Sequence, residues 1–316
     1  MVQGWNWVST YLSEEQPLGN VTTFASRVLS QTDELVIDPE YGLMGNINRI
    51  VPTAGYKIEA ATNFSIAMRG RIYKKPISVQ PGWNWIAYPY YESRGLADVL
   101  TGAEEGDYIV SQATGFSQYS GGKWEGTLDV LIPGQGYLYK SVSSKQLTFD
   151  ITNAPASEPA PVSQLVVDAR RYPNTMNITA RIYNEDIEVP AQQYTVYAFA
   201  GEELRGISQC VGSNHYLTVY GEDPVSITLI VEQAETSETF CTEKTLTFTD
   251  DVVGSYEKPF AIDMGPTTGI SQLTTSAPMT VYTVDGVLVS RDATIKSLRS
   301  LPKGVYIVNR RKCYIR

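Results

Sequence analysis

The stretch GWNWVSTYL at residues 4–12 recurs as GWNWIAYPY at residues 82–90, and these two copies hold four of the chain's five tryptophans. Two further anchors recur in the same order: DELVI (33–37) aligns with DYIVS (107–111), and NRIVPTAGYKI (48–58) aligns with DVLIPGQGYLY (129–139). The order is kept while the loop lengths change, so the first half of the chain is predicted to be a duplication. We place repeat 1 at residues 1–80 and repeat 2 at residues 81–152.

Each repeat is predicted to be rich in β-strands and to carry one short helix. WNWIAYPY alternates large and small side chains, and the later segments are rich in β-branched and aromatic residues separated by Gly, Pro and Asn. Apolar residues at helical spacing in TFASRVLS (23–30) and GLADVLTGA (95–103) indicate the helices. The glycines of PTAGY and PGQGY indicate a tight turn that enters a strand.

The rest of the chain is predicted to hold a linker and two more β-modules. NAPASEPAPVSQ (153–164) has the composition of a semi-rigid Pro/Ala linker. Residues 165–265 hold strand patterns broken by turns roughly every ten residues, which is typical of an immunoglobulin-like β-sandwich. After a break at Gly265–Gly269, residues 270–316 form a small C-terminal β-module with hairpin turns at Asp285-Gly286 and Lys303-Gly304. The predicted fold class is therefore all-β.

Charge and hydropathy exclude two classes of partner. The chain has 25 basic and 34 acidic residues, a net charge of -9, so we expect no binding to nucleic acid. It lacks an apolar run of about 18 residues, so we expect no membrane insertion. The N-terminus enters repeat 1 without the apolar region of a signal peptide, so either the protein is cytosolic or an export signal has been removed. The rest of the chain favours the second alternative.

The sequence offers little catalytic chemistry, so we predict a protein that is not an enzyme and uses no cofactor or metal. The only histidine, His215, has no nucleophile motif near it and is interpreted as a polar residue at the start of a strand. Asp107, Glu125 and Asp129 are candidate carboxylates for glycoside hydrolysis, although AEEGD (103–107) reads more simply as a solvated turn. TDDVVGS (249–255) is taken as a turn rather than a calcium site.

Two other polar features have a structural interpretation. Arg205 lies between apolar strand patterns, and we expect it to form an ion pair. Three cysteines are too few for a disulfide framework and match no zinc motif. Cys210 and Cys241 are candidates for a disulfide if their strands are neighbours.

The tryptophans of GWNW leave two interpretations open. Rings two residues apart in a strand lie on one face, so each motif presents an aromatic slab. Such a slab can fill the core of a small domain, or it can stack on the apolar face of a sugar ring. For the second case the candidate ligand-binding residues are Trp83, Trp85, Tyr88, Tyr90, Tyr119 and Trp124, with Tyr91 as a further aromatic neighbour. Asn84, Gln112 and Gln118 are the candidate hydrogen-bonding partners of the sugar hydroxyls.

The C-terminal segment carries two spaced motifs and a basic final strand. Y-x-x-x-G is found at Tyr282 and Gly286, and L-x-x-G-x-Y-x-V at Leu301, Gly304, Tyr306 and Val308, followed by NRRKCYIR. Over about 45 residues this segment resembles the sorting domain of Bacteroidetes proteins that are secreted by the type IX route.

A second set of spaced positions lies in the middle of the chain, at Ala198, Phe199, Gly201, Arg205, Gly206, Gly254, Ser255 and Pro259. At these positions the chain is similar to a domain that recurs in large Bacteroidetes surface proteins, and the paired GWNW units are similar to modules upstream of it. The resemblance implies an extracellular or outer-surface protein that acts as an adhesin or contacts a glycan or a host or cell-surface protein. The alternative is the accessory, substrate-binding portion of a secreted hydrolase, or a small glycoside hydrolase.

Overall fold

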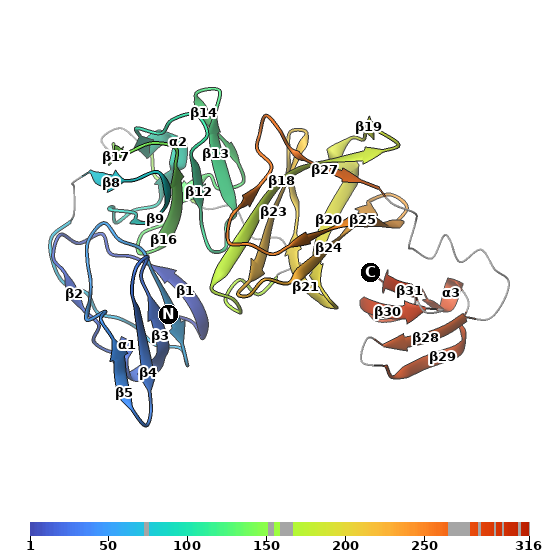
Figure 1. Cartoon of the computed structure of the whole chain (residues 1–316), viewed down its shortest axis with the longest axis horizontal. Coiled ribbons are helices and arrows are strands. Elements are labelled where there is room, and N and C mark those ends of the chain that lie inside the picture. Colours follow the sequence, from blue (N-terminus) through green and yellow to red (C-terminus); the bar gives the residue numbers. More distant parts are fainter. Residues whose placement is uncertain are drawn as a thin grey trace. The chain divides into compact units, whose positions relative to one another are not determined.

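The computed structural model describes residues 1–72, 76–150, 155–158, 167–264, 279–283, 286–293, 295–298, 300–308 and 311–315. Strands hold 53% of the residues and helices 5%, so the predicted all-β class is confirmed (Figure 1). The chain divides into two compact units, Met1–Thr175 and Met176–Arg316. None of the helices in the described ranges is long and apolar enough to cross a membrane. Most of the predicted linker and the whole break at Gly265–Gly269 lie outside the described residues.

Both repeats of the first unit form a five-stranded antiparallel sheet, and the strand order is the same in each. Outward from the GWNW strand, the repeat 1 sheet contains β1 (Gly4–Val8), β7 (Tyr56–Ala60), β3 (Ala25–Leu29), β4 (Glu34–Asp38) and β5 (Gly42–Gly45). The repeat 2 sheet contains β9 (Gly82–Ala87), β16 (Gly136–Ser141), β12 (Tyr108–Val110), β13 (Phe116–Ser120) and β14 (Lys123–Gly126). The shared order is the result that a duplication predicts.

Short elements complete the first unit. The helices α1 (Val21–Phe24) and α2 (Leu96–Val99) have one turn each. Two-stranded pairs recur as β2 (Gln16–Pro17) with β6 (Arg49–Ile50), and β10 (Arg94–Gly95) with β15 (Val130–Leu131). A three-stranded sheet contains β11 (Leu100–Thr101), β17 (Lys145–Phe149) and β8 (Ile77–Val79). Strand β8 thus pairs with a strand of repeat 2, although it precedes residue 81.

Two sequence interpretations within the repeats were wrong. DELVI forms β4, whose counterpart is β13, whereas DYIVS contains β12, which takes the place of β3. TFASRVLS was predicted to be helical, but residues 25–29 form β3, a central strand paired with both β4 and β7. Eight residues are too few for apolar spacing to separate a helix from one helical turn followed by a strand.

Each repeat has its own core on one face of its sheet, and the tryptophans of GWNW lie on the opposite face. The core of repeat 1 includes Val28, Leu35 and Ile58, and the core of repeat 2 includes Ile86 and Tyr139. Side chains alternate along a strand, so the residues beside Ile86 point away from that core. Trp5 and Trp7 are nevertheless buried, with 3% and 4% of their surface exposed, while Trp83 and Trp85 are half-buried.

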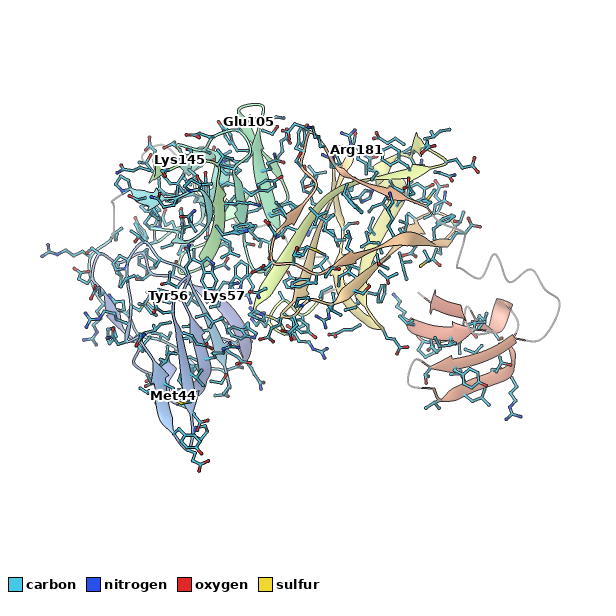
Figure 2. All side chains as sticks on the ribbon, viewed as in Figure 1. Met44, Tyr56, Lys57, Glu105, Lys145 and Arg181 are labelled. Atoms are coloured by element: carbon cyan, nitrogen blue, oxygen red, sulfur yellow. The ribbon has the colours of Figure 1, made fainter. Side chains whose placement is uncertain are left out.

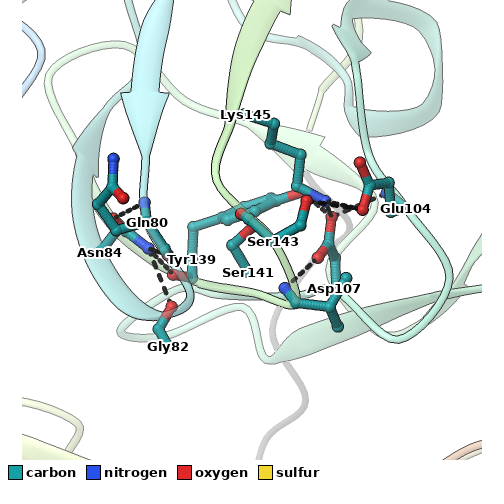
Figure 3. A network of polar contacts seen from close by, with 10 residues as sticks. Gln80, Gly82, Asn84, Glu104, Asp107, Tyr139, Ser141, Ser143 and Lys145 are labelled. Carbon is teal, nitrogen blue, oxygen red and sulfur yellow. Dashed lines mark hydrogen bonds and ion pairs between the residues drawn. The ribbon is translucent and has the colours of Figure 1, made fainter.

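The glycine and asparagine of GWNW shape the entry to the strand in the same way in both repeats. Gly4 and Gly82 have φ of 92° and 91°, values that favour glycine. The amide nitrogen of Asn6 donates to the carbonyls of Val2 and Gly4, both at 2.7 Å. Asn84 donates in the same way to the carbonyls of Gln80 at 2.7 Å and Gly82 at 2.9 Å (Figure 3).

The backbone of each GWNW strand is bound by a glutamine of the other repeat. Gln112 accepts the Trp7 N–H at 2.9 Å and donates to the Trp5 carbonyl at 2.7 Å. Gln31 accepts the Trp85 N–H at 2.9 Å and donates to the Trp83 carbonyl at 2.8 Å. The contacts are the same with the two repeats exchanged, so GWNW is part of a reciprocal joint between them.

The second repeated motif, with its Gly-Tyr pair, completes this joint. A Cβ on Gly136 would lie 2.7 Å from the Val8 carbonyl oxygen, and one on Gly55 would lie 3.1 Å from that of Ile86. Each glycine therefore lets its turn approach the GWNW strand of the other repeat. The following tyrosines hold the turns: the Val51 N–H donates to the Tyr56 hydroxyl at 3.0 Å, and the Ile132 N–H to the Tyr137 hydroxyl at 2.7 Å.

A buried lysine lies between the tryptophans of the two repeats. Lys57, labelled in Figure 2, is 3% exposed. Its Nζ lies 4.7 Å from the ring centroid of Trp7 and 4.4 Å from that of Trp85. It also donates to Asn174 Oδ1 at 2.8 Å, and the Trp7 indole donates to the Pro173 carbonyl at 3.1 Å. Cation–π contacts of a desolvated lysine contribute about 2 kcal/mol, so Lys57 stabilises the joint.

The second unit begins with a β-sandwich. One sheet contains β19 (Ile187–Glu188), β18 (Asn174–Asn184), β23 (Asn214–Gly221) and β22 (Gln209–Val211), with β26 (Val252–Val253) and β27 (Phe260–Asp263) beside β18. The other contains β21 (Glu203–Ile207), β20 (Tyr194–Ala200), β24 (Ser226–Gln233) and β25 (Thr239–Thr247), and a 3₁₀ turn at Ala191–Gln193 precedes β20. Alternate apolar residues of both sheets share one core, as in a sandwich.

The C-terminal module is a four-stranded antiparallel sheet with one short helix. Its order is β29 (Leu288–Ala293), β28 (Met279–Thr283), β30 (Gly304–Val308) and β31 (Arg311–Ile315), and α3 (Ile295–Leu298) follows β29. The described core residues are Val281, Ala293, Leu298, Tyr306 and Val308. Asp285 of the first predicted hairpin turn lies outside the described residues, and Gly304 of the second begins β30.

Candidate functional site: a groove between the two repeats

The aromatic residues predicted to form a sugar platform are divided between the two faces of the repeat 2 sheet. Trp83 and Trp85 lie on the face opposite the core. Tyr88 is fully buried in the core and its hydroxyl donates to the Glu92 carbonyl at 3.0 Å; burial raises the pKa of Tyr88. Tyr119 and Trp124 are a cross-strand pair, so they share a face, and the Trp124 ring packs against the core. These residues do not form one surface.

The polar residues that were predicted to bind the sugar hydroxyls beside the platform are also dispersed. Asn84 is used in the strand entry and Gln112 in the joint, while Gln118 is buried. Tyr90 packs on Tyr91, with ring centroids 4.7 Å apart. Tyr91 is 47% exposed and, with Gln112, borders a large hollow.

A groove of about 1050 Å³ lies in the first unit beside the GWNW strand of repeat 1. Segments from both repeats line it: residues 6–12 and 66–70 of repeat 1, and 112–113 and 132–135 of repeat 2. Met1, Ile72, Tyr91 and Arg170 complete the lining. We call this hollow the inter-repeat groove.

The walls of the inter-repeat groove are held by hydrogen bonds. The Ser9 N–H donates to the Gly134 carbonyl at 2.9 Å and the Ser9 hydroxyl to the Gln135 carbonyl at 2.6 Å, which fixes repeat 1 against repeat 2. The Gln16 side chain accepts the Arg69 N–H and donates to the Arg69 carbonyl, both at 3.0 Å. The groove is therefore preformed by the same joint that the repeated motifs build.

The chemistry of the groove lining is aromatic, amide and basic. Tyr11 is half-buried and Tyr91 is exposed, and Gln135 offers an amide. Arg69 and Arg170 supply positive charge, and none of the described lining residues is Asp or Glu. The acidic chain thus has a locally basic groove with rings at its border.

The sequence pointed to only part of this site. Tyr91 and Gln112 were predicted to contribute, whereas Tyr11, Arg69 and Arg170 were not. Tyr11 lies inside the repeated stretch itself, which was a usable signal. Arg170 lies in a segment joined to β1 only in the tertiary structure, where its carbonyl accepts the Trp5 N–H at 2.8 Å. Nothing local in the sequence indicates that contact.

The candidate hydrolase carboxylates lie apart from the groove and have structural roles or are exposed. Asp107, predicted to be in a solvated turn, is fully buried and contacts Lys145 Nζ at 2.5 Å and the Tyr139 hydroxyl at 2.5 Å (Figure 3). Burial and the bond to Asp107 raise the pKa of Tyr139. Glu125 pairs with Lys123 at 2.6 Å, and Asp129 is exposed.

The second unit has a smaller hollow of about 360 Å³ beside the turn at 185–186. Its lysine, Lys244, is already paired with Asp263 at 3.3 Å. Arg205 pairs with Glu203 at 3.0 Å and donates to the Tyr220 carbonyl at 3.1 Å, so the predicted structural role of Arg205 is confirmed. Within the described ranges, no group of three His, Cys, Asp or Glu residues is placed to hold a metal ion.

The suggested disulfide is not formed. Neither Cys210 nor Cys241 is in a disulfide: Cys210 lies exposed on β22 and Cys241 lies on β25, and these are the end strands of two different sheets. Cys210 is an exposed residue, but its thiol is partly desolvated, and this desolvation raises the pKa of the thiol. The strand pattern alone did not reveal that the two strands belong to opposite layers.

His215 is a buried neutral histidine whose titration affects stability. It is 1% exposed, and its Nδ1 lies 3.2 Å from the Ser208 hydroxyl. Burial lowers the pKa of His215 from 6.5 to about 4. Between these two pKa values the unfolded chain binds a proton that the folded chain does not. The contribution of the neutral His215 to the free energy of unfolding is therefore complete above pH 6.5 and is lost as the pH falls toward 4.

We expect His215→Gln to remove about 3 kcal/mol of this pH dependence, because a pKa difference of one unit corresponds to 1.36 kcal/mol. The measurement is hydrogen exchange of β23 in parent and variant at neutral pH and near pH 4. All five tryptophans lie in the first unit, so fluorescence does not follow this transition. Equal losses of hydrogen-exchange protection in parent and variant would contradict the conclusion that His215 causes this pH dependence.

No family model, no curated protein and no solved structure matches this chain.

Proposed function

We propose that this chain is a non-catalytic, glycan-contacting part of an adhesin-like protein that is secreted or exposed on the cell surface, and that the inter-repeat groove receives the glycan. The observation that carries the proposal is the preformed groove bordered by Tyr11 and the exposed Tyr91. Sugar rings present apolar C–H faces that stack on aromatic side chains, and their hydroxyls require nearby polar groups such as the Gln135 amide.

The resemblance of the C-terminal and middle segments to Bacteroidetes surface proteins supports an extracellular location. The net charge of -9 argues against nucleic acid as a partner. A host or cell-surface protein is the other candidate partner. Contact with a protein would not depend on free saccharide, and competition with free oligosaccharide separates the two.

The alternative is the substrate-binding portion of a secreted hydrolase, or a small hydrolase. Glycoside hydrolysis uses two carboxyl groups about 5–10 Å apart that flank the scissile bond. The described lining of the groove contains no Asp or Glu, and Asp107 forms an ion pair with Lys145. These observations favour binding over hydrolysis.

The test is binding of the full chain to a glycan array, followed by affinity measurements on the best ligand. We expect Tyr91→Ala to weaken that binding about tenfold, a loss of about 1.4 kcal/mol, because it removes the exposed ring. Tyr11→Ala is expected to weaken it in the same direction. Tyr41→Ala is the matched control, since Tyr41 is 73% exposed and lies outside the groove.

Unchanged binding in both groove variants would reject the inter-repeat groove as the site. Loss of binding in Tyr41→Ala alone would move the site to the β4–β5 hairpin. Release of reducing sugar by the parent protein would favour the hydrolase alternative.

A further inference from the structure

The inter-repeat groove is basic although the chain is acidic. Arg69 and Arg170 both line it, and neither guanidinium forms an ion pair with a described residue. This is unusual in a chain where acidic residues outnumber basic ones by 34 to 25. Two arginines that line one groove and have no ion-pair partner in the part of the chain that the structure describes provide a site for negative charge.

Both arginines are fixed through their backbones. The Gln16 side chain holds the N–H and the carbonyl of Arg69. The Arg170 N–H donates to Asp168 Oδ1 at 3.0 Å, and the Arg170 carbonyl accepts the Trp5 N–H at 2.8 Å. The backbone positions of both lining arginines are therefore determined by the fold.

Arg170 has a further feature that points to a ligand. Its Nε is buried and has no hydrogen-bond acceptor among the described residues. A buried donor without an acceptor is costly, and native structures rarely leave one unexplained. The two terminal nitrogens of Arg170 are not buried, and such a pair forms a fork that binds a planar carboxylate through two parallel hydrogen bonds.

We propose that the inter-repeat groove selects acidic saccharides, in which uronic acid carboxylates bind Arg170 and Arg69 while a sugar ring stacks on Tyr91. This inference rests on the proposed glycan contact and specifies the class of glycan. A carboxylate fits the guanidinium fork, and the absence of described acidic side chains from the lining leaves it unopposed.

The experiment compares each probe with its uncharged counterpart. The probes are oligogalacturonate, alginate and hyaluronan oligosaccharides, each also with its carboxyl groups methyl-esterified, and a neutral galactan. We expect at least one uronate oligosaccharide to bind the full chain, and esterification to weaken that binding at least tenfold. The affinity for the acidic form should fall between 50 and 200 mM NaCl, since the contact is ionic.

Variants then assign the charge to the two arginines. Arg170→Gln and Arg69→Gln should each weaken binding of the acidic form about tenfold and leave binding of the ester unchanged. Arg49→Gln is the matched control, because Arg49 is exposed, pairs with Glu15 and lies outside the groove. If Arg170→Gln does not fold, Arg69→Gln and the ester comparison still decide the question.

Equal binding of acid and ester, or arginine variants that bind as the parent does, would overturn this inference while leaving the glycan contact in place. Preference for dextran sulfate over dextran without preference for any uronate would identify sulfate as the anion and also overturn it. Failure of every saccharide to bind would instead reject the proposed function itself.

Discussion

Replacement of Asp107 by alanine is expected to destabilise the first unit by about 3–5 kcal/mol, because it leaves the buried Lys145 with only the half-exposed Glu104 as a counter-ion. Lys145 is 9% exposed at its side chain and contacts Asp107, which is fully buried. The same carboxylate accepts the Val142 N–H at 2.9 Å and the Glu104 N–H at 2.8 Å. All these donors lose their acceptor at once.

Glu104→Ala is the matched control for Asp107→Ala. Glu104 approaches the same lysine at 3.3 Å, but half of its side chain is exposed. An exposed ion pair contributes about 0–1 kcal/mol, so this variant should remain close to the parent. Denaturant unfolding followed by tryptophan fluorescence reports the first unit, which holds all five tryptophans.

The double variant Asp107→Ala with Lys145→Met distinguishes an unpaired charge from a packing defect. Removing the lysine as well should restore part of the lost stability, since no buried cation is then left without its buried carboxylate. If Asp107→Ala costs no more than Glu104→Ala, the buried pair is not a stabilising element of repeat 2.

Replacement of Trp7 by alanine is the second change with a large expected effect, about 3–5 kcal/mol. The Trp7 ring is 4% exposed, contacts Lys57 and donates to the Pro173 carbonyl. Its removal opens a cavity at the joint between the repeats and takes one of the two rings from the buried lysine.

Trp85→Ala is the matched comparison, because Trp85 occupies the corresponding place in repeat 2 and also faces Lys57, but it is half-buried. It should cost clearly less than Trp7→Ala, since less surface is removed from water when Trp85 packs. Denaturant unfolding of both variants at neutral pH decides the order. An equal or larger loss for Trp85→Ala would show that burial of Trp7 does not dominate the joint.

Much of the fold was accessible from the sequence because it depends on short-range patterns. The anchors GWNW and Gly-Tyr recur in order, so the duplication and the all-β class followed from the residues alone. The sequence pattern failed where more than one short strand segment could be aligned with the same counterpart. DELVI was aligned with DYIVS, although DYIVS contains β12, which occupies the place of β3. Two strands are equivalent when they pair with equivalent neighbours in their sheets, and the residues of the two segments do not specify those neighbours.

The candidate site depended far less on local pattern. Tyr91 and Gln112 were predicted, but the remaining platform residues lie on two faces of one sheet. The sequence could not assign Tyr88 to the core and Trp85 to the opposite face without knowing which face each strand buries. Arg69 and Arg170 enter the groove through backbone contacts to Gln16 and Trp5, which are distant in the chain.

By itself, the sequence determined that one β-rich unit is present twice and that a glycine, an asparagine and two tryptophans begin a strand in each copy. Only the tertiary structure decided what the tryptophans contact. Alternation places both rings on one face of a strand, but it does not choose their neighbours. The neighbours of Trp7 are Lys57 and Pro173. They meet at Trp7 because the two repeats pack reciprocally and because the segment that follows repeat 2, with Arg170 and Pro173, lies beside β1.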